Sequence, residues 1–207
     1  MAAADSTGLD TSGASRYFVR RRDACSKQPQ TVSYRRFPKL EMVCDCRTHL
    51  VLCAFAGIGP TPDVASLRRL LFCTLRRVGV QTLLADAGYD SESNHSFARD
   101  GCGVRSVTPS THGRPCTRAG AALRGRHRRR LQRLRDFRYG QRWQVETVVS
   151  MIKRNLGQCV AARSDSMRSK EVMLKVLTHN LMLIAEVLIR LFYRAFASPL
   201  SCPPRRA

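Results

Sequence analysis

The stretch YGQRWQVETVVSMIKRNLG, residues 139–157, places four polar side chains on one predicted helix. At about 100° per residue, these side chains fall within roughly 60° of one another around the helix axis. They are Tyr139, Arg142, Glu146 and Lys153. Apolar residues occupy the adjoining side, so the helix is predicted to dock on a core while one edge presents the polar groups. A carboxylate flanked by a phenol, a guanidinium and an ammonium suits a site that binds a metal and a phosphate chain together.

The same spacing has a plainer interpretation. Arg142 and Glu146 are four residues apart, and surface helices often form salt bridges at that spacing, worth about 0.2 to 0.5 kcal/mol. Trp143, beside the polar edge, is expected to lie at the margin of the core, with stacking on a flipped nucleic-acid base as the alternative. His179 and Asn180 are expected to pack or hydrogen bond within a C-terminal helix rather than to bind a ligand.

The charge of the chain favours a polyanionic partner. Its 207 residues include 36 Lys and Arg against 15 Asp and Glu, a formal net charge of +21. Such an excess repels itself unless the protein lies against a polyanion, and nucleic acid is the first candidate. The most basic segment, residues 114–138, is predicted to follow DNA phosphates, with a solvated surface as the alternative. Its predicted DNA-binding residues are Arg126, Arg128, Arg129 and Arg130.

Cysteine use and hydropathy argue against zinc and against a membrane span. The nine cysteines are odd in number and form no Cys-x-x-Cys pair, so they are interpreted as reduced and mostly buried. No basic-then-apolar leader is present, and a protein that is not secreted is expected. The longest apolar run, residues 172–196, is interrupted by charged and polar side chains and is predicted to be a packing helix.

Strand and helix patterns alternate along the first half of the chain. They predict a β-hairpin in 39–55, a helix in 59–79 with Thr61 as N-cap and Pro62 at its first position, and a strand ending near Asp86. A helix over 91–100 and a strand over 103–109 follow. The second half is predicted to hold two helices, 136–156 and 170–197. This order is typical of a mixed α/β layer fold.

Several motifs together resemble a known family. The order Tyr-x2-Arg-x3-Glu-x6-Lys matches the signature of bacterial insertion-sequence transposases of the DDE class. The segments DSTGLD and LLADAGYD resemble those that bear the family's first two catalytic aspartates, which would be Asp5 and Asp86. GIGPTPDVASLRRLL and LKVLTHNLMLI are also similar to the family, and the resemblance covers nearly the whole chain.

The resemblance implies a fold and a chemistry. The expected fold is ribonuclease H-like, a mixed five-stranded sheet flanked by helices, with one catalytic domain over 1–197 and a Pro/Arg tail over 198–207. Asp5, Asp86 and Glu146 would be the catalytic carboxylates and the ligands of Mg²⁺ or Mn²⁺, because hard cations favour oxygen donors. Arg142 and Lys153 would meet the charge of the phosphate, and Tyr139 would position the backbone.

The resemblance also implies partners and a setting. The partners would be the terminal inverted repeats of the element and its target DNA, which the enzyme would cut and join. A homodimer in the synaptic complex, no membrane partner, and a bacterial cytoplasmic location at the nucleoid are expected.

Two departures from the family leave other interpretations open. The first strand is expected to be truncated, because only three residues after Met1 precede Asp5, and no N-terminal region for recognising DNA ends is expected. The chain is therefore interpreted as the C-terminal portion of a transposase, with a catalytically inactive remnant that binds DNA non-specifically as the alternative. A basic RNA-binding protein is a third interpretation. Four other carboxylates could compete for the catalytic role: Asp10, Asp63, Asp90 and Asp136.

Overall fold

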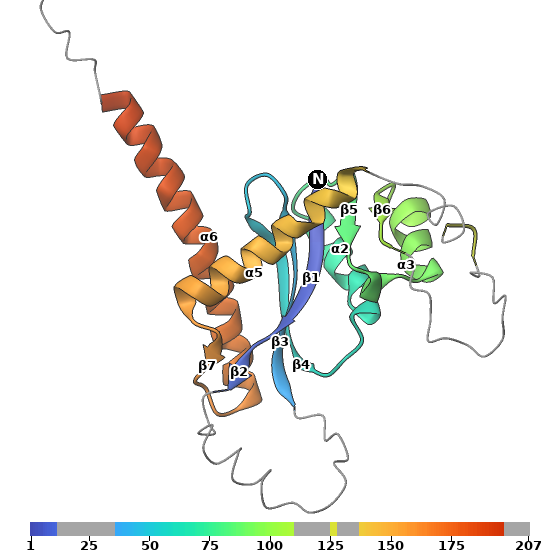
Figure 1. Cartoon of the computed structure of the whole chain (residues 1–207), viewed down its shortest axis with the longest axis horizontal. Coiled ribbons are helices and arrows are strands. Elements are labelled where there is room, and N and C mark those ends of the chain that lie inside the picture. The colour runs from blue at the N-terminus through green and yellow to red at the C-terminus, as the bar shows by residue number, and fades with distance from the viewer. Residues whose placement is uncertain (12–35, 110–124, 128–136, 197–207) are drawn as a thin grey trace, which may run out of the picture.

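A five-stranded mixed sheet forms the centre of the molecule (Figure 1). The computed structural model describes residues 1–11, 36–109, 125–127 and 137–196. The strand order is β4-β3-β1-β5-β6, with β1 antiparallel to β3 and parallel to β5. The strands are β1 (Ala2–Gly8), β3 (Phe37–Asp45), β4 (Val51–Gly59), β5 (Thr82–Ala85) and β6 (Arg105–Val107). This order and the flanking helices agree with the expected ribonuclease H-like α/β fold.

Helices cover both faces of the sheet and create two cores. The helices are α2 (Leu67–Leu75), α3 (Glu92–Ser96), α5 (Trp143–Leu156) and α6 (Asp165–Phe196). Because side chains alternate along a strand, Ala3 of β1 packs in the core under α5 and α6, whereas Ala2 and Ala4 pack in the core with α2. A second, two-stranded sheet is formed by β2 (Asp10–Thr11), which pairs in parallel with β7 (Cys159–Val160), the short strand that follows α5.

Most predicted elements are confirmed, with changes at their ends. The hairpin is β3 and β4, and the strand before Asp86 is β5. The helix predicted over 59–79 is wrong at its start: a short 3-10 turn, η1 (Asp63–Ala65), comes first, and Pro62 rather than Thr61 is its N-cap residue, without a side-chain cap. The helix predicted over 91–100 is α3 followed by a π-helical turn, η3 (Phe97–Gly101).

The expectation of a stunted first strand is corrected. β1 has seven residues and continues past Asp5 to Gly8, and it is paired with β3 along its whole length. Asp5 lies opposite Met42 in the middle of that ladder. Ser6, Thr7 and Gly8, which follow Asp5, also pair with β3, so the strand is longer than the three alanines before Asp5 would allow.

The C-terminal helix begins earlier than predicted and packs over only part of its length. α6 starts at Asp165, five residues before the predicted position. Its buried residues, Val172, Val176 and His179, all lie in the first half, and the second half projects away from the domain (Figure 1). The prediction of a packing helix is therefore wrong for residues 184–196, which are exposed. By length and composition alone, α6 is long and apolar enough to cross a membrane.

Polar side chains attach the first half of α6 to β4, as predicted for a hydrogen-bonding role. The Val51 amide donates to Asn180 Oδ1 and Asn180 Nδ2 donates to the Val51 carbonyl, both at 2.9 Å. His179 Nε2 lies 3.1 Å from the His49 carbonyl, and burial lowers the pKa of His179.

Asn180→Ala is expected to lower the free energy of unfolding by about 2 kcal/mol, because it leaves both polar groups of Val51 without this partner. Urea unfolding measures the loss. Thr178→Ala, at an exposed position of the same helix, is the control and is expected to change stability by less than about 0.5 kcal/mol. Equal effects of the two substitutions would contradict the role of Asn180.

Candidate active site

Strand register brings Asp5 and Asp86 together. Ala4 of β1 pairs with Ala85 of β5 at the end of a parallel ladder, so Asp5 and Asp86 each directly follow a residue of this pair. Asp86 directly follows β5 and is the N-cap of the short turn η2 (Ala87–Tyr89), where its Oδ1 accepts from the Ala87 amide at 2.7 Å. Its carboxylate is therefore fixed at the strand end and remains exposed.

Glu146 reaches the same face from α5. The helix buries Val145, Val148 and Ile152 in the core that also contains Ala3 of β1. Alternation along β1 places Asp5 on the same face as Ala3, and therefore beneath α5. Glu146, in the first turn of α5, stays about half exposed at the edge of this contact.

The polar edge predicted for one continuous helix is built from two elements. Tyr139 and Arg142 lie in a 3-10 turn, η4 (Phe137–Arg142), and only Glu146 and Lys153 lie in α5. A 3-10 turn has about three residues per turn instead of 3.6, so the angular prediction for Tyr139 and Arg142 was wrong. The turn nevertheless brings them to the carboxylates: Arg142 is ion-paired with Glu146 and lies 4.0 Å from Asp5.

Asp5 interacts electrostatically with Asp86 and Glu146. Burial raises the pKa of Asp5 from 3.8 to about 6, opposed by the Ser6 amide and by Arg142, while Asp86 and Glu146 raise it further. Burial also raises the pKa of Tyr139, and the same two carboxylates act in the same direction. Asp5 and Tyr139 therefore both lie within electrostatic range of Asp86 and Glu146.

The remaining predicted DNA contacts are only partly described. Lys153 is half-buried and lies seven residues after Glu146, two turns along the same face of α5. Arg126 is ion-paired with Asp100 at 2.7 Å, well away along the chain from the three carboxylates. Arg128, Arg129 and Arg130, most of the basic segment 114–138, Asp136 and the tail lie outside the described residues.

Comparison with known proteins identifies the family. The sequence model of the family described as Transposase DDE domain matches residues 2–181. The chain belongs to this family. A comparison with curated proteins found no match. Among solved structures, the DDE domain is similar to the piggyBac transposase in a synaptic complex with hairpin DNA, with 11% identity and a TM-score of 0.49. That match covers 88% of this chain and 46% of the other chain, so this chain spans less than half of that transposase's length.

The donor types of the DDE domain fit a hard divalent cation. Three carboxylates supply oxygen ligands, and a cation would oppose the rise in the pKa of Asp5 that burial, and to a lesser degree Asp86 and Glu146, cause. Within the described ranges, no group of three or more His, Cys, Asp and Glu side chains is close enough to hold a metal ion. Arg142, paired with Glu146 and near Asp5, supplies positive charge among the carboxylates.

A buried network beside Asp5 was not predicted from the sequence. Ser6 Oγ donates to Asp63 Oδ1 at 2.7 Å, and Asp63 is ion-paired at 2.5 Å with Lys39, which is only 5% exposed. Lys39 also contacts Glu41 at 3.1 Å. These contacts fix β1 at the residue after Asp5. They also engage Asp63, which was considered a competing carboxylate.

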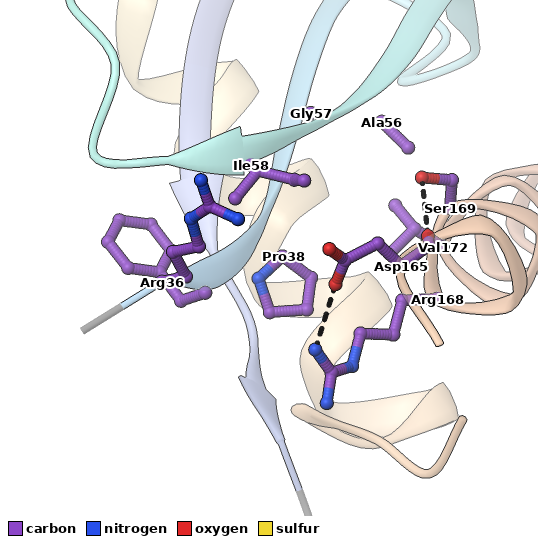
Figure 2. A pocket seen from close by; sticks show the side chains of 10 residues that line it. Arg36, Pro38, Ala56, Gly57, Ile58, Asp165, Arg168, Ser169 and Val172 are labelled. Carbon is purple, nitrogen blue, oxygen red and sulfur yellow. Dashed lines mark hydrogen bonds and ion pairs between the residues drawn. The ribbon is translucent and has the colours of Figure 1, made fainter. Parts of the chain in front are cut away.

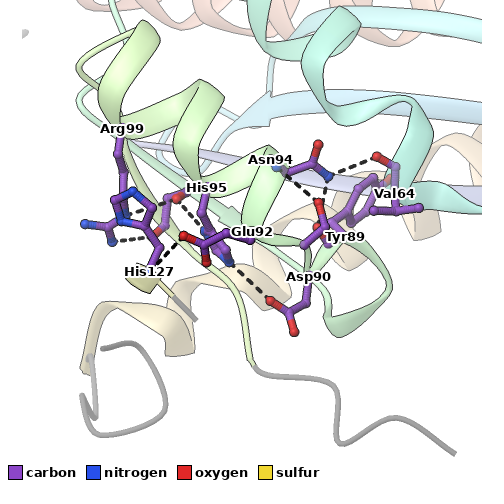
Figure 3. A network of polar contacts seen from close by, with 10 residues as sticks. Val64, Tyr89, Asp90, Glu92, Asn94, His95, Arg99 and His127 are labelled. Carbon is purple, nitrogen blue, oxygen red and sulfur yellow. Dashed lines mark hydrogen bonds and ion pairs between the residues drawn. The ribbon is translucent and has the colours of Figure 1, made fainter. Parts of the chain in front are cut away.

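A second network holds the turn that follows Asp86 (Figure 3). Asn94 Nδ2 donates to the Val64 carbonyl at 2.9 Å and to the Tyr89 carbonyl at 3.1 Å. His95 contacts Asp90 at 3.2 Å, which gives this competing carboxylate a structural partner. The network joins η2 to α3 and thereby supports the position of Asp86.

Two further predictions have clear outcomes. Trp143 was expected at the margin of the core, but it is 54% exposed, one residue after Arg142. Among the described cysteines, burial is confirmed for Cys44, Cys46 and Cys53, whereas Cys73 and Cys102 are half-buried and Cys159 is exposed.

A pocket lies apart from these three carboxylates. It is lined where β3 and β4 meet the start of α6, and Asp165 and Arg168 form an ion pair at its edge (Figure 2). Asp5, Asp86 and Glu146 do not line it.

Proposed function

We propose that this chain is the catalytic portion of a DNA transposase that cuts and joins the ends of an insertion sequence. The observation that supports the proposal is that Arg142 is ion-paired with both Asp5 and Glu146, while Asp86 and Glu146 are near enough to raise the pKa of Asp5. The three carboxylates would hold Mg²⁺ or Mn²⁺. Bound divalent ions would activate a water or a DNA 3′-hydroxyl and stabilise the leaving oxygen during in-line displacement at phosphorus.

The cationic groups around the carboxylates have proposed roles with DNA. Arg142 can give planar, two-pronged donation to phosphate oxygens, and Lys153 can add a point charge further along α5. Tyr139 would orient the sugar-phosphate backbone. Arg126 and the neighbouring arginines would bind phosphates outside the reacting position. The net charge of +21 supports a polyanionic substrate. The proposed setting is the nucleoid of a bacterial cell.

The test uses a labelled duplex carrying the terminal repeats that flank the gene. With Mg²⁺, the protein is expected to nick the duplex at the repeat and join the released 3′-hydroxyl to a target duplex. With EDTA, neither product is expected. Denaturing gels measure both products, and absence of both in Mg²⁺ would contradict the proposed activity.

A catalytically inactive remnant that binds DNA non-specifically is the second candidate, and the net charge of +21 suits such binding. It would bind DNA with an affinity that falls steeply with salt and would give no Mg²⁺-dependent product. A salt titration of DNA affinity, run beside the product assay, separates the two candidates. Preference for RNA over duplex DNA in the same titration would favour the RNA-binding interpretation instead.

A further inference from the structure

Each candidate catalytic aspartate accepts a hydrogen bond from the amide of the residue that follows it. The Ser6 amide donates to Asp5 Oδ1 at 2.8 Å, and the Ala87 amide donates to Asp86 Oδ1 at 2.7 Å. Hydrogen bonds of this kind orient the carboxylates that bind metals in proteins. A group that fixes the main chain after Asp5 and Asp86 therefore also fixes the direction in which their other oxygens point.

The side chain of Asp63 contacts both of these segments. Ser6 Oγ donates to Asp63 Oδ1 at 2.7 Å. The other oxygen, Asp63 Oδ2, packs against Gly88 in the turn η2, where an added Cβ atom would lie only 3.2 Å from it. Glycine at this position therefore lets the turn that follows Asp86 approach the carboxylate closely. One side chain thus touches the residue after Asp5 and the turn after Asp86.

Lys39 holds Asp63 in this place. Its ammonium group has three donors, which reach Asp63 Oδ1 at 2.5 Å, the Thr61 carbonyl at 2.7 Å and Glu41 Oε1 at 3.1 Å. Burial lowers the pKa of Lys39, but the hydrogen bonds with Asp63 and Glu41 outweigh burial and raise the pKa above its ordinary value. Lys39 therefore stays charged although it is buried, and it keeps the Asp63 carboxylate in one orientation.

Asp63 lies on the other face of the sheet from the carboxylates of the candidate site. Side chains alternate along β1, so Ser6 shares the face of Ala4, in the core with α2, and Asp5 lies on the opposite face. Asp63 meets the Ser6 hydroxyl on that face and is ion-paired there with Lys39. The strand itself therefore separates Asp63 from Asp5, and Asp63 can act on Asp5 only through the main chain.

We propose that Asp63, held by Lys39, is a positioning residue for both aspartates of the candidate site. It acts on Asp5 through Ser6 and on Asp86 through the turn η2. The role rests on the proposed function, because it concerns the carboxylates that would hold the metal. Asp63 would not itself bind the metal.

Asp63→Ala and Glu41→Ala are the matched variants that test this role. Each removes one carboxylate partner of Lys39, but only Asp63 accepts from the Ser6 hydroxyl. Hydrogen exchange of the Ser6 and Ala87 amides is measured by NMR in the full chain without metal or DNA. Exchange at both amides is expected to be about tenfold faster in Asp63→Ala, as for the loss of one hydrogen bond, and nearly unchanged in Glu41→Ala.

Two further variants separate the steps of the proposed link. Asp63→Asn keeps an oxygen where Ser6 and Lys39 both donate, so it is expected to retain the slow exchange of the wild type. Ser6→Ala removes only the link to Asp5 and leaves the Lys39–Asp63 ion pair in place. Exchange is then expected to rise at residue 6 and to stay slow at Ala87. Because Ser6→Ala disturbs the fold least, it decides the link to Asp5 even where Asp63→Ala fails to fold.

Titration with Mn²⁺ alone, followed by electron paramagnetic resonance, measures the consequence for the metal. The affinity for Mn²⁺ is expected to fall by about tenfold or more in Asp63→Ala and to stay unchanged in Glu41→Ala. Equal exchange rates in these two variants, or equal affinities where the wild type binds Mn²⁺, would overturn the proposal. If the wild type does not bind Mn²⁺, the proposed metal chemistry is contradicted instead, and the exchange rates still decide whether Asp63 positions the two aspartates.

Discussion

Glu146→Gln is expected to abolish Mg²⁺-dependent joining, with a loss of about a thousandfold or more, as when one member of a catalytic set that acts as a unit is removed. The substitution keeps the size of the side chain and removes its charge. It weakens the ion pair with Arg142, but a pair at this spacing contributes only about 0.2 to 0.5 kcal/mol to stability. The fold is therefore expected to survive.

Glu186→Gln is the matched control for this substitution. Glu186 and Glu146 are both 55% exposed, and each is ion-paired with an arginine four residues away. If Glu146 formed only a surface ion pair, Glu146→Gln and Glu186→Gln would have equal effects on joining. The protein has a single tryptophan, Trp143, and its fluorescence can report DNA binding close to the site. Unchanged DNA affinity with lost joining is expected for Glu146→Gln, and joining at the control rate would refute the catalytic assignment.

Asp5→Asn is expected to stabilise the metal-free protein at pH 7.5 by about 3 kcal/mol, since a rise of about two pKa units corresponds to about 1.36 kcal/mol each. Burial favours the neutral form of Asp5, so the folded state binds more protons than the unfolded state between about pH 4 and about pH 6. The free energy of unfolding therefore falls as the pH rises through that window. The amide of asparagine avoids this cost and can still accept from Ser6.

Urea unfolding in EDTA at pH 4 and at pH 7.5 measures this effect. The stabilisation by Asp5→Asn is expected to be large at pH 7.5 and to disappear near pH 4. Asp10→Asn, at an exposed position of β2, controls for the change in net charge. A variant that is no more stable than wild type at pH 7.5 would contradict burial as the cause of the raised pKa of Asp5. Added Mg²⁺ is expected to stabilise the wild type more than the variant.

Local patterns in the sequence predicted the parts of the fold that depend on local forces. Alternating apolar residues indicated β3 and β4, and the buried run before Asp86 indicated β5. Periodicity also placed Glu146 on a helix. Asp5 was different, because its importance came only from the family resemblance. Its place beside Asp86 depends on pairing between strands about 80 residues apart, which no local pattern encodes.

Tertiary contacts explain what sequence patterns missed. The 3-10 geometry of η4 changes the angular positions of Tyr139 and Arg142, although the spacing of their apolar neighbours fits an α-helix. The Lys39–Asp63 ion pair joins a strand to a turn that is distant in the sequence, so the local sequence around either residue does not predict it. The second half of α6 has the composition of a packing helix, but in the structure no described part of the chain covers it.

The central position of β1 constrains the order in which the chain can fold. The first strand of the sequence lies between β3 and β5, so its two neighbours are synthesised much later than it is. The β3–β4 hairpin can form from local contacts, whereas β1 must wait for partners that leave the ribosome after it. Asp5, in the middle of β1, and Asp86, directly after β5, can therefore come together only after β5 has left the ribosome, whereas pairing of β1 with β3 can begin earlier.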